Sequence, residues 1–277
     1  MSAVRAAMLS AALLATPAGA ADLRARGRAT AEQIGPAVVT IRVVLKLKIG
    51  FAGQGQDQEQ KMEVAGVVID SSGLTLASAA SIDPSGALRR ISGGQASRMK
   101  LEAEVKETTL LLEDGTEVES DVVLKDTDLD LAFLKPREPG RAFTAVSLRR
   151  RSGTVPALTE IFVVGRLGKL ASRALAVATG EVRAYVRGPA PYYVTDGETS
   201  SFTGAIAYTS DGVPLGVFVN RFSSTPDGRG GGMLEGAFGR SASDVVMTVL
   251  RPVDKVLELA AQARAMKPPP AADAGER

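Results

Sequence analysis

The side chains of this chain that could do chemistry are carboxylates, hydroxyls and lysine amines, because its 277 residues include no histidine and no cysteine. Without cysteine there is no disulfide, no thiolate nucleophile and no cysteine-ligated metal. Without histidine there is no imidazole general base and no histidine-ligated zinc. A nucleophilic hydroxyl would need another activating group, such as a lysine amine. The sequence singles out no serine and lysine as such a pair, so this alternative stays open.

Three aspartates, Asp126, Asp128 and Asp130, have the spacing of the first ligands of a calcium-binding loop. The glycine and the distal glutamate that such a loop needs are absent, and the leucines among these aspartates suit a strand. A glycine-rich run at residues 228–232 lacks the Lys-Ser/Thr that follows in a phosphate-binding loop. We therefore predict no bound metal and no cofactor.

The N-terminus has the pattern of a secretion signal. Arg5 supplies the positive charge, residues 6–15 form an apolar run, and Ala18-Gly19-Ala20 fits the small-residue cleavage motif. The apolar run is shorter than the ~18 residues that a membrane span needs, and no later run reaches that length. We therefore predict a signal peptide at residues 1–20, export to the periplasm or the medium, and no transmembrane span in the mature chain. An ordinary buried helix is the alternative.

The charge of the chain gives no reason to expect a nucleic-acid partner. The formal net charge is +2, and apart from the run Arg149–Arg151 the basic residues are spread along the sequence. The sequence does not indicate the oligomeric state.

The residues that follow the signal read as an all-β protein. Apolar and polar residues alternate with period two from Val39 to Ile49, which is typical of a strand with one wet face. Residues 51–60 are rich in glycine and glutamine without periodicity, so we predict a loop there. Further short apolar runs separated by turn signals continue in two halves, which favours barrels or sandwiches. We divide the chain into a leading helix and N-terminal barrel (21–136), a linker (137–151), a C-terminal barrel (152–251), a closing helix opened by Pro252 (252–266) and a disordered tail (267–277).

Several motifs in order resemble trypsin-like serine proteases of the HtrA/Deg type. Residues 196–220 contain a polar loop and an Asp-Gly turn between two apolar strands, and are similar to the family's nucleophile segment. Residues 66–73 (GVVIDSSG) resemble the hairpin that leads to its catalytic histidine. Residues 126–135 (DTDLDLAFLK) resemble the run that holds its catalytic aspartate. This resemblance covers residues 34–261 and implies two packed antiparallel β-barrels with a C-terminal helix. The family's PDZ domain has no counterpart in the sequence.

Carried over residue by residue, the resemblance places Ala80 at the histidine position, Asp130 at the aspartate position and Thr203 at the serine position. A protease of this kind needs a base, a carboxylate that orients the base, and donors for the oxyanion. Ala80 cannot titrate, and Ser201 and Thr203 fall at the oxyanion-hole positions, where Ser201 replaces a glycine. The alternative for Asp130 is a carboxylate that nearby hydroxyls and amides satisfy. The resemblance therefore implies a degenerate triad.

We expect a non-catalytic protein that binds a peptide or a protein in the cleft between the barrels. In the parent family a peptide adds as a strand beside the nucleophile segment, so we predict contacts from Tyr192, Tyr193 and Phe218. The alternative for these aromatic residues is packing inside the second barrel. Two other functions stay open: an active hydrolase with a substitute site, and a structural module of an envelope complex.

Overall fold

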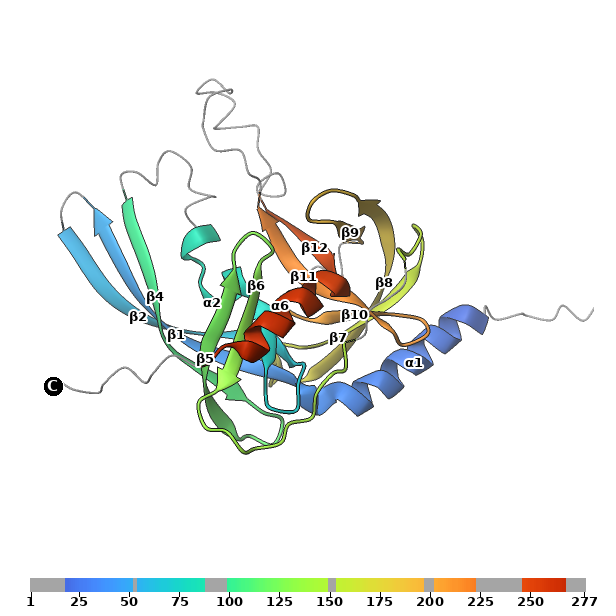
Figure 1. The fold of residues 1–277 in the computed structure, drawn as a ribbon, viewed down its shortest axis with the longest axis horizontal. Coiled ribbons are helices and arrows are strands. Elements are labelled where there is room, and N and C mark those ends of the chain that lie inside the picture. Colours follow the sequence, from blue (N-terminus) through green and yellow to red (C-terminus); the bar gives the residue numbers. More distant parts are fainter. Residues whose placement is uncertain are drawn as a thin grey trace, which may run out of the picture.

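The computed structural model describes residues 18–51, 54–87, 99–148, 153–196, 202–222 and 246–267. Two closed six-stranded antiparallel barrels make up most of this part of the chain (Figure 1). The first barrel has the order β1-β2-β3-β6-β5-β4. Its strands are β1 (Val38–Phe51), β2 (Gln54–Val68), β3 (Thr75–Ser78), β4 (Met99–Leu111), β5 (Glu117–Asp126) and β6 (Leu131–Pro136).

The second barrel closes in the order β10-β11-β12-β9-β8-β7. Its strands are β7 (Glu160–Arg166), β8 (Leu175–Val186), β9 (Tyr192–Thr195), β10 (Ile206–Thr209), β11 (Pro214–Phe222) and β12 (Val246–Pro252). The helices are α1 (Ala18–Ile34), η1 (Gly35–Ala37), α2 (Ala79–Ile82), η3 (Lys169–Ala171) and α6 (Val253–Ala265). The predicted fold class, a double antiparallel β-barrel with a C-terminal helix, is confirmed.

Three strands of the second barrel, β7, β10 and most of β11, bury both of their faces. Val163, Ala207 and Phe218 belong to an inner core, whereas their neighbours Val164 and Ile206 belong to the core shared with the first barrel. Because side chains alternate along a strand, each of these strands contributes to the two cores in turn. This explains why β10 and most of β11 are continuous apolar runs rather than alternating ones.

The C-terminal helix α6 links the two barrels. Its apolar residues recur at helical spacing and are buried, and the helix packs on β11 and β12 as well as on β5 and β6. At its C-terminal end, the amine of Lys135 in β6 donates to the carbonyl oxygens of Arg264 at 2.8 Å and Met266 at 2.6 Å. A cation at this end also suits the partial negative charge of the helix C-terminus. The helix therefore helps to fix the position of one barrel relative to the other.

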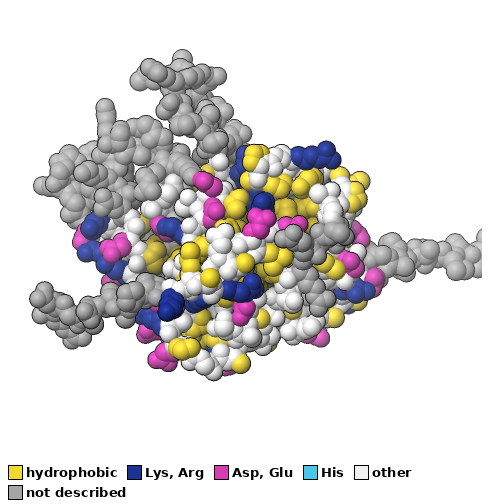
Figure 2. Space-filling view, viewed as in Figure 1, with side chains coloured by type: hydrophobic (Ala, Val, Ile, Leu, Met, Phe, Trp, Pro, Cys, Tyr) yellow, Lys and Arg dark blue, Asp and Glu magenta, His cyan; other side chains and the backbone are white. Residues whose placement is uncertain are grey.

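The prediction of a loop at residues 51–60 is wrong over most of that range, because β2 begins at Gln54. β1 and β2 pair from Val38↔Val67 to Phe51↔Gln54, and β4 pairs with the other edge of β1 as far as Phe51↔Met99. These three strands extend beyond the barrel at one end of the molecule (Figure 1). Lys, Arg, Asp and Glu side chains gather at the base of this extension (Figure 2). The polar composition of Gln54–Gln60 reflects a strand that does not line a closed core, and periodicity therefore failed to reveal it.

The segment predicted as a linker lies against the first barrel over part of its length. The amide of Phe143 donates to the carbonyl oxygen of Ser71 at 3.0 Å, and that of Val146 donates to Val68 at 2.8 Å. The predicted domain limits stay predictions. The predicted signal peptide (1–20) lies almost wholly outside the described residues, as does the predicted tail beyond Lys267. Within the described residues, no helix has the length and apolar character to cross a membrane.

Candidate functional site

Asp130 ends the turn between β5 and β6 and is the most deeply buried acidic residue of the site, at 1% exposure. Its φ is +57°, a left-handed conformation that aspartate tolerates better than most residues. The carboxylate accepts three hydrogen bonds. Oδ1 accepts from the amide of Ala80 at 2.7 Å, and Oδ2 accepts from Ser78 Oγ at 2.8 Å and from the amide of Asn220 at 2.6 Å. This is the arrangement that the sequence left open as the alternative for Asp130.

The environment of Asp130 opposes ionisation on balance. Burial raises the pKa of the Asp130 carboxyl, although the three hydrogen bonds and the positive charge of Arg251 act in the opposite direction. Two of the three donors come from the first barrel and one comes from β11 of the second. The carboxylate therefore joins the two barrels at their boundary.

Ala80 lies in the short helix α2, directly after β3. The hydroxyl of Ser78 caps this helix by accepting from the amide of Ser81 at 3.2 Å, while it donates to Asp130. The amide of Ala79 donates to the carbonyl oxygen of Asp130 at 3.2 Å. The backbone at residues 78–80 is thus fixed against Asp130, but the methyl group of Ala80 offers no proton acceptor.

Thr203 lies in a tight turn that leads into β10. The amide of Ala205 donates to Phe202 at 2.9 Å, and the amide of Gly204 donates to the carbonyl oxygen of Phe218 at 2.8 Å. Gly204 has a φ of +89°, and a Cβ built on it would lie 2.7 Å from the carbonyl oxygen of Ala65 in β2. Only glycine fits this contact without displacement, because a Cβ would collide with backbone. The same Cβ position is 3.8 Å from the amide nitrogen of Ser78, so the Thr203–Gly204 turn reaches the group around Asp130.

The structure therefore brings the three predicted triad positions to one boundary between the barrels, around Ser78. Ser201, the other predicted oxyanion-hole position, lies outside the described residues. A sequence model for the trypsin-like peptidase domain matches residues 64–217. The chain belongs to the trypsin-like peptidase family. The match runs from β2 to β11 and includes Ala80, Asp130 and Thr203. A search of curated proteins found no match.

Two of the three aromatic residues that we predicted to bind a peptide are in the core of this trypsin-like fold. Phe218 is fully buried and Tyr193 is 2% exposed, and both belong to the inner core of the second barrel. The Tyr193 hydroxyl accepts from the amide of Val155 at 3.3 Å, and its ring lies 4.8 Å from that of Tyr185. The prediction of peptide contacts is therefore wrong for these two side chains, because strand alternation turns them inward.

Tyr192 lies on the opposite face of β9 and is half-buried. The guanidinium carbon of Arg221, in β11, lies 4.9 Å from the centroid of the Tyr192 ring. This distance is typical of a cation–π contact. Tyr192 thus remains a candidate contact residue of the trypsin-like chain.

Sequence reasoning missed four residues at this boundary, which are Ser78, Asn220, Arg221 and Arg251. Ser78 and Asn220 act on Asp130 through a hydroxyl and a backbone amide, and neither group carries a distinctive sequence signal. Arg251 in β12 is 1% exposed, and its Nη1 donates to the carbonyl oxygens of Ala190 at 2.9 Å and Pro191 at 3.0 Å. Burial lowers the pKa of this guanidinium.

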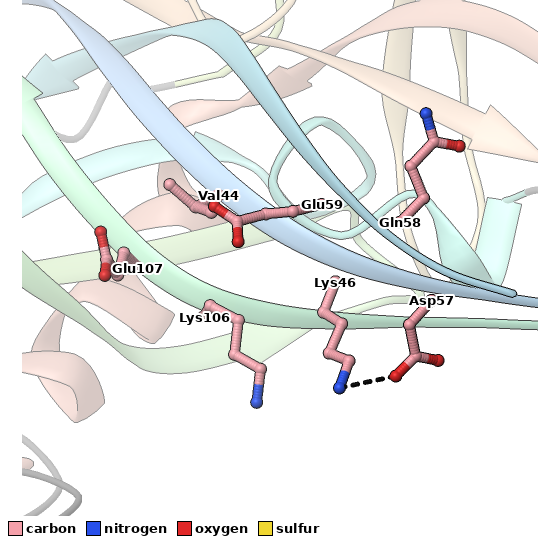
Figure 3. A pocket seen from close by; sticks show the side chains of 7 residues that line it. All are labelled: Val44, Lys46, Asp57, Gln58, Glu59, Lys106 and Glu107. Atoms are coloured by element: carbon pink, nitrogen blue, oxygen red, sulfur yellow. Dashed lines mark ion pairs between the residues drawn. The ribbon is translucent and has the colours of Figure 1, made fainter. Parts of the chain in front are cut away.

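A hollow on the molecule lies elsewhere, on the charged face of the extended β1, β2 and β4 strands (Figure 3). Its lining residues are Val44, Lys46, Asp57, Gln58, Glu59, Lys106 and Glu107. The amine of Lys46 and the carboxylate of Asp57 form an ion pair at 2.7 Å within it. None of the predicted site residues lines this hollow, so the motif matches and the hollow point to different places. The residues at the family's catalytic positions lie at the boundary around Asp130 and not in this hollow.

Proposed function

We propose that this chain is an exported, HtrA/Deg-like member of the trypsin-like family that binds a peptide or a protein and does not cleave it. The observation that carries the proposal is that no base contacts Asp130 among the described residues. Its carboxylate accepts from the hydroxyl of Ser78 and from the amides of Ala80 and Asn220, whereas an orienting aspartate also accepts from a catalytic base. The chain contains no histidine that could be this base.

The chemistry of acyl transfer supports the same proposal. A threonine hydroxyl is a weak nucleophile at neutral pH unless a neighbouring base takes its proton. The resemblance places this base at position 80. The residue there is Ala80, and its methyl side chain cannot accept a proton. Without the base, the remaining acceleration over water would come from the oxyanion donors and from binding alone, and is on the order of 10³–10⁴ when those donors are intact.

Binding does not need the triad, because a peptide that adds as a strand is held mostly by backbone hydrogen bonds. One edge of β11 faces away from β12. At this edge the amide of Phe218 donates to the carbonyl oxygen of Ala205, and the carbonyl oxygen of Phe218 accepts from the amide of Gly204. The amide of Asn220 donates to Asp130 at the same edge. Backbone groups of alternate residues in a strand point to the same edge. The edge of β11 from Asn220 to Phe222 is therefore the place where we propose that the ligand strand adds.

The proposal is tested by probing the purified mature chain, residues 21–277, with an array of extended decapeptides of varied sequence. We expect saturable binding of a subset of these peptides, together with a change in hydrogen exchange in the β11 segment that ends at Phe222. Saturable binding that leaves exchange in this segment unchanged would place the site elsewhere, and no binding to any peptide would contradict the proposal.

A further inference from the structure

Two arginines flank Tyr192 on one face of the second barrel. β11 and β12 pair Phe218 with Leu250, and β12 and β9 pair Leu250 with Tyr193, so these three residues share the inner face. Alternation then places Arg221, Arg251 and Tyr192 together on the opposite face. Burial lowers the pKa of Arg251, and the nearby positive charge of Arg221 lowers it further.

We call Arg221, Tyr192 and Arg251 the Arg221 cluster. Arg221 is the exposed member of this cluster. In the part of the chain that the structure describes, the guanidinium of Arg221 lies against the Tyr192 ring and forms no ion pair. A guanidinium over an aromatic ring keeps its N–H groups in its own plane, where they can bind both oxygens of one carboxylate. The Tyr192 ring thus holds Arg221 on this face without using those N–H groups.

Arg251 is the buried member of the cluster. Among the described residues its buried Nε has no hydrogen-bond partner, although Nη1 donates to two carbonyl oxygens. In the described part of the chain no hydrogen bond or ion pair joins Arg251 to the carboxylates of Asp126 and Asp130, so these act on it through their field. Oδ1 of Asp126 accepts from the amides of Asp128 at 3.0 Å and Leu129 at 2.8 Å. Arg251 therefore adds positive charge to the cluster with no bonded counterion among the residues that the structure describes.

The cluster lies next to the edge where we propose that a ligand strand adds. Arg221 follows Asn220, whose amide donates to Asp130 at that edge. Side chains directly opposite each other on neighbouring strands have Cβ atoms about 5 Å apart. A peptide residue opposite Arg221 would thus present its side chain to the guanidinium.

We propose that the Arg221 cluster selects peptides with a glutamate or aspartate at one position, with Arg221 as the residue that binds the carboxylate and Tyr192 as the residue that orients it. This inference rests on the proposed function, since it names the ligand class of the same edge. It concerns the side-chain preference alone, whereas the proposed function concerns the backbone contacts.

The test uses three pools of fluorescein-labelled extended decapeptides with randomised flanks, which carry Glu, Gln or Lys at the central position. Binding to the mature chain is measured by fluorescence anisotropy at low and at moderate salt. We expect about tenfold tighter binding of the Glu pool than of the Gln pool, as for a charge-assisted hydrogen-bonded pair, and a smaller difference at higher salt. Arg221→Gln should abolish the difference, and Arg221→Lys should restore only part of it.

Arg183→Gln is the matched control, because Arg183 is another exposed arginine of the second barrel. It should keep the full preference for Glu, and all variants should have the melting temperature of the wild type. Equal binding of the Glu and Gln pools by the wild type, or a preference that survives Arg221→Gln, would overturn this inference and leave the proposed function standing. Failure of the wild type to bind any pool would overturn both.

Discussion

The backbone amide of Asn220 in β11 donates to Oδ2 of Asp130 at 2.6 Å, so the second barrel bonds directly to the buried carboxylate of the first. Ser78 and Ala80 complete the set of donors from the other side. The residue at the position of the family's catalytic aspartate thus has a structural role in this chain. This role determines what its replacement should do.

Asp130→Ala should lower the free energy of unfolding by about 2–4 kcal/mol, because it leaves three buried donors without an acceptor. Asp130→Asn should cost less, about 1–3 kcal/mol, since its amide oxygen still accepts while its NH₂ group faces other donors. Urea denaturation at neutral pH measures both. Glu59→Gln, on the exposed part of β2, is the control and should change the value by less than about 0.5 kcal/mol. An Asp130→Ala variant as stable as this control would show that the carboxylate does not hold the barrels together.

Gly204→Ala should destabilise the protein more than a glycine replacement in an open turn. Gly204 has φ +89° and would place its Cβ 2.7 Å from the Ala65 carbonyl oxygen, whereas Gly115 has φ +82° and nothing within 4 Å. Gly204→Ala and Gly115→Ala should each lower the free energy of unfolding by about 1–2 kcal/mol, because alanine is strained in a left-handed backbone conformation. The contact with Ala65 should add about 1–3 kcal/mol for Gly204→Ala alone. Equal losses of stability for Gly204→Ala and Gly115→Ala, measured by thermal denaturation, would mean that the Thr203–Gly204 turn does not contact β2 closely.

The ion pair between Glu63 of β2 and Arg173 beside η3 should make stability depend on pH. The two hydrogen bonds are 2.9 and 2.6 Å long, and the bond to Arg173 lowers the pKa of Glu63 from its ordinary value of 4.5. A lowered pKa gives stability that is present above the unfolded-state value and is lost as the pH falls through the folded-state pKa. Glu63→Gln should therefore cost about 0.5 kcal/mol at pH 7, because the pair is partly exposed, and nothing near pH 2. A loss that is the same at both pH values would assign the effect to packing rather than to charge.

Tyr192→Ala should weaken the binding of peptides that the wild type binds by about 1–3 kcal/mol, because it removes an aromatic contact and frees Arg221. Tyr192→Phe keeps the ring and should bind nearly as well. Titration of both variants, at unchanged melting temperature, measures this. Phe218 is not a suitable probe, since its fully buried side chain would cost about 3–5 kcal/mol of stability when truncated. Unchanged binding by Tyr192→Ala would remove Tyr192 from the site.

Apolar periodicity predicted most strands, and the family resemblance predicted the two packed barrels, but periodicity failed where a strand leaves the core. Gln54–Gln60 pairs with β1 through backbone bonds, and backbone bonds require no particular side chains. Strand alternation alone would have placed Phe218 and Tyr193 in the core. The family resemblance instead favoured a peptide-binding role for both residues. Motif order located Ala80, Asp130 and Thr203, because each lies in a matched run or shortly after one. Asn220 could not be found in this way, since it acts through an amide that every residue except proline has, 90 positions from Asp130.

The central claim is that this trypsin-like chain does not cleave peptide bonds. Incubation of the purified mature chain with unfolded casein and with a fluorescent serine-directed phosphonate tests it most directly, with active trypsin as the positive control and Thr203→Ala as the matched variant. We expect no turnover above that of Thr203→Ala and no labelling of Thr203, and we expect Ala80→His with Thr203→Ser to recover little, because Ser201 still occupies a glycine position of the family. Saturable casein cleavage by the wild type that Thr203→Ala abolishes would contradict the account.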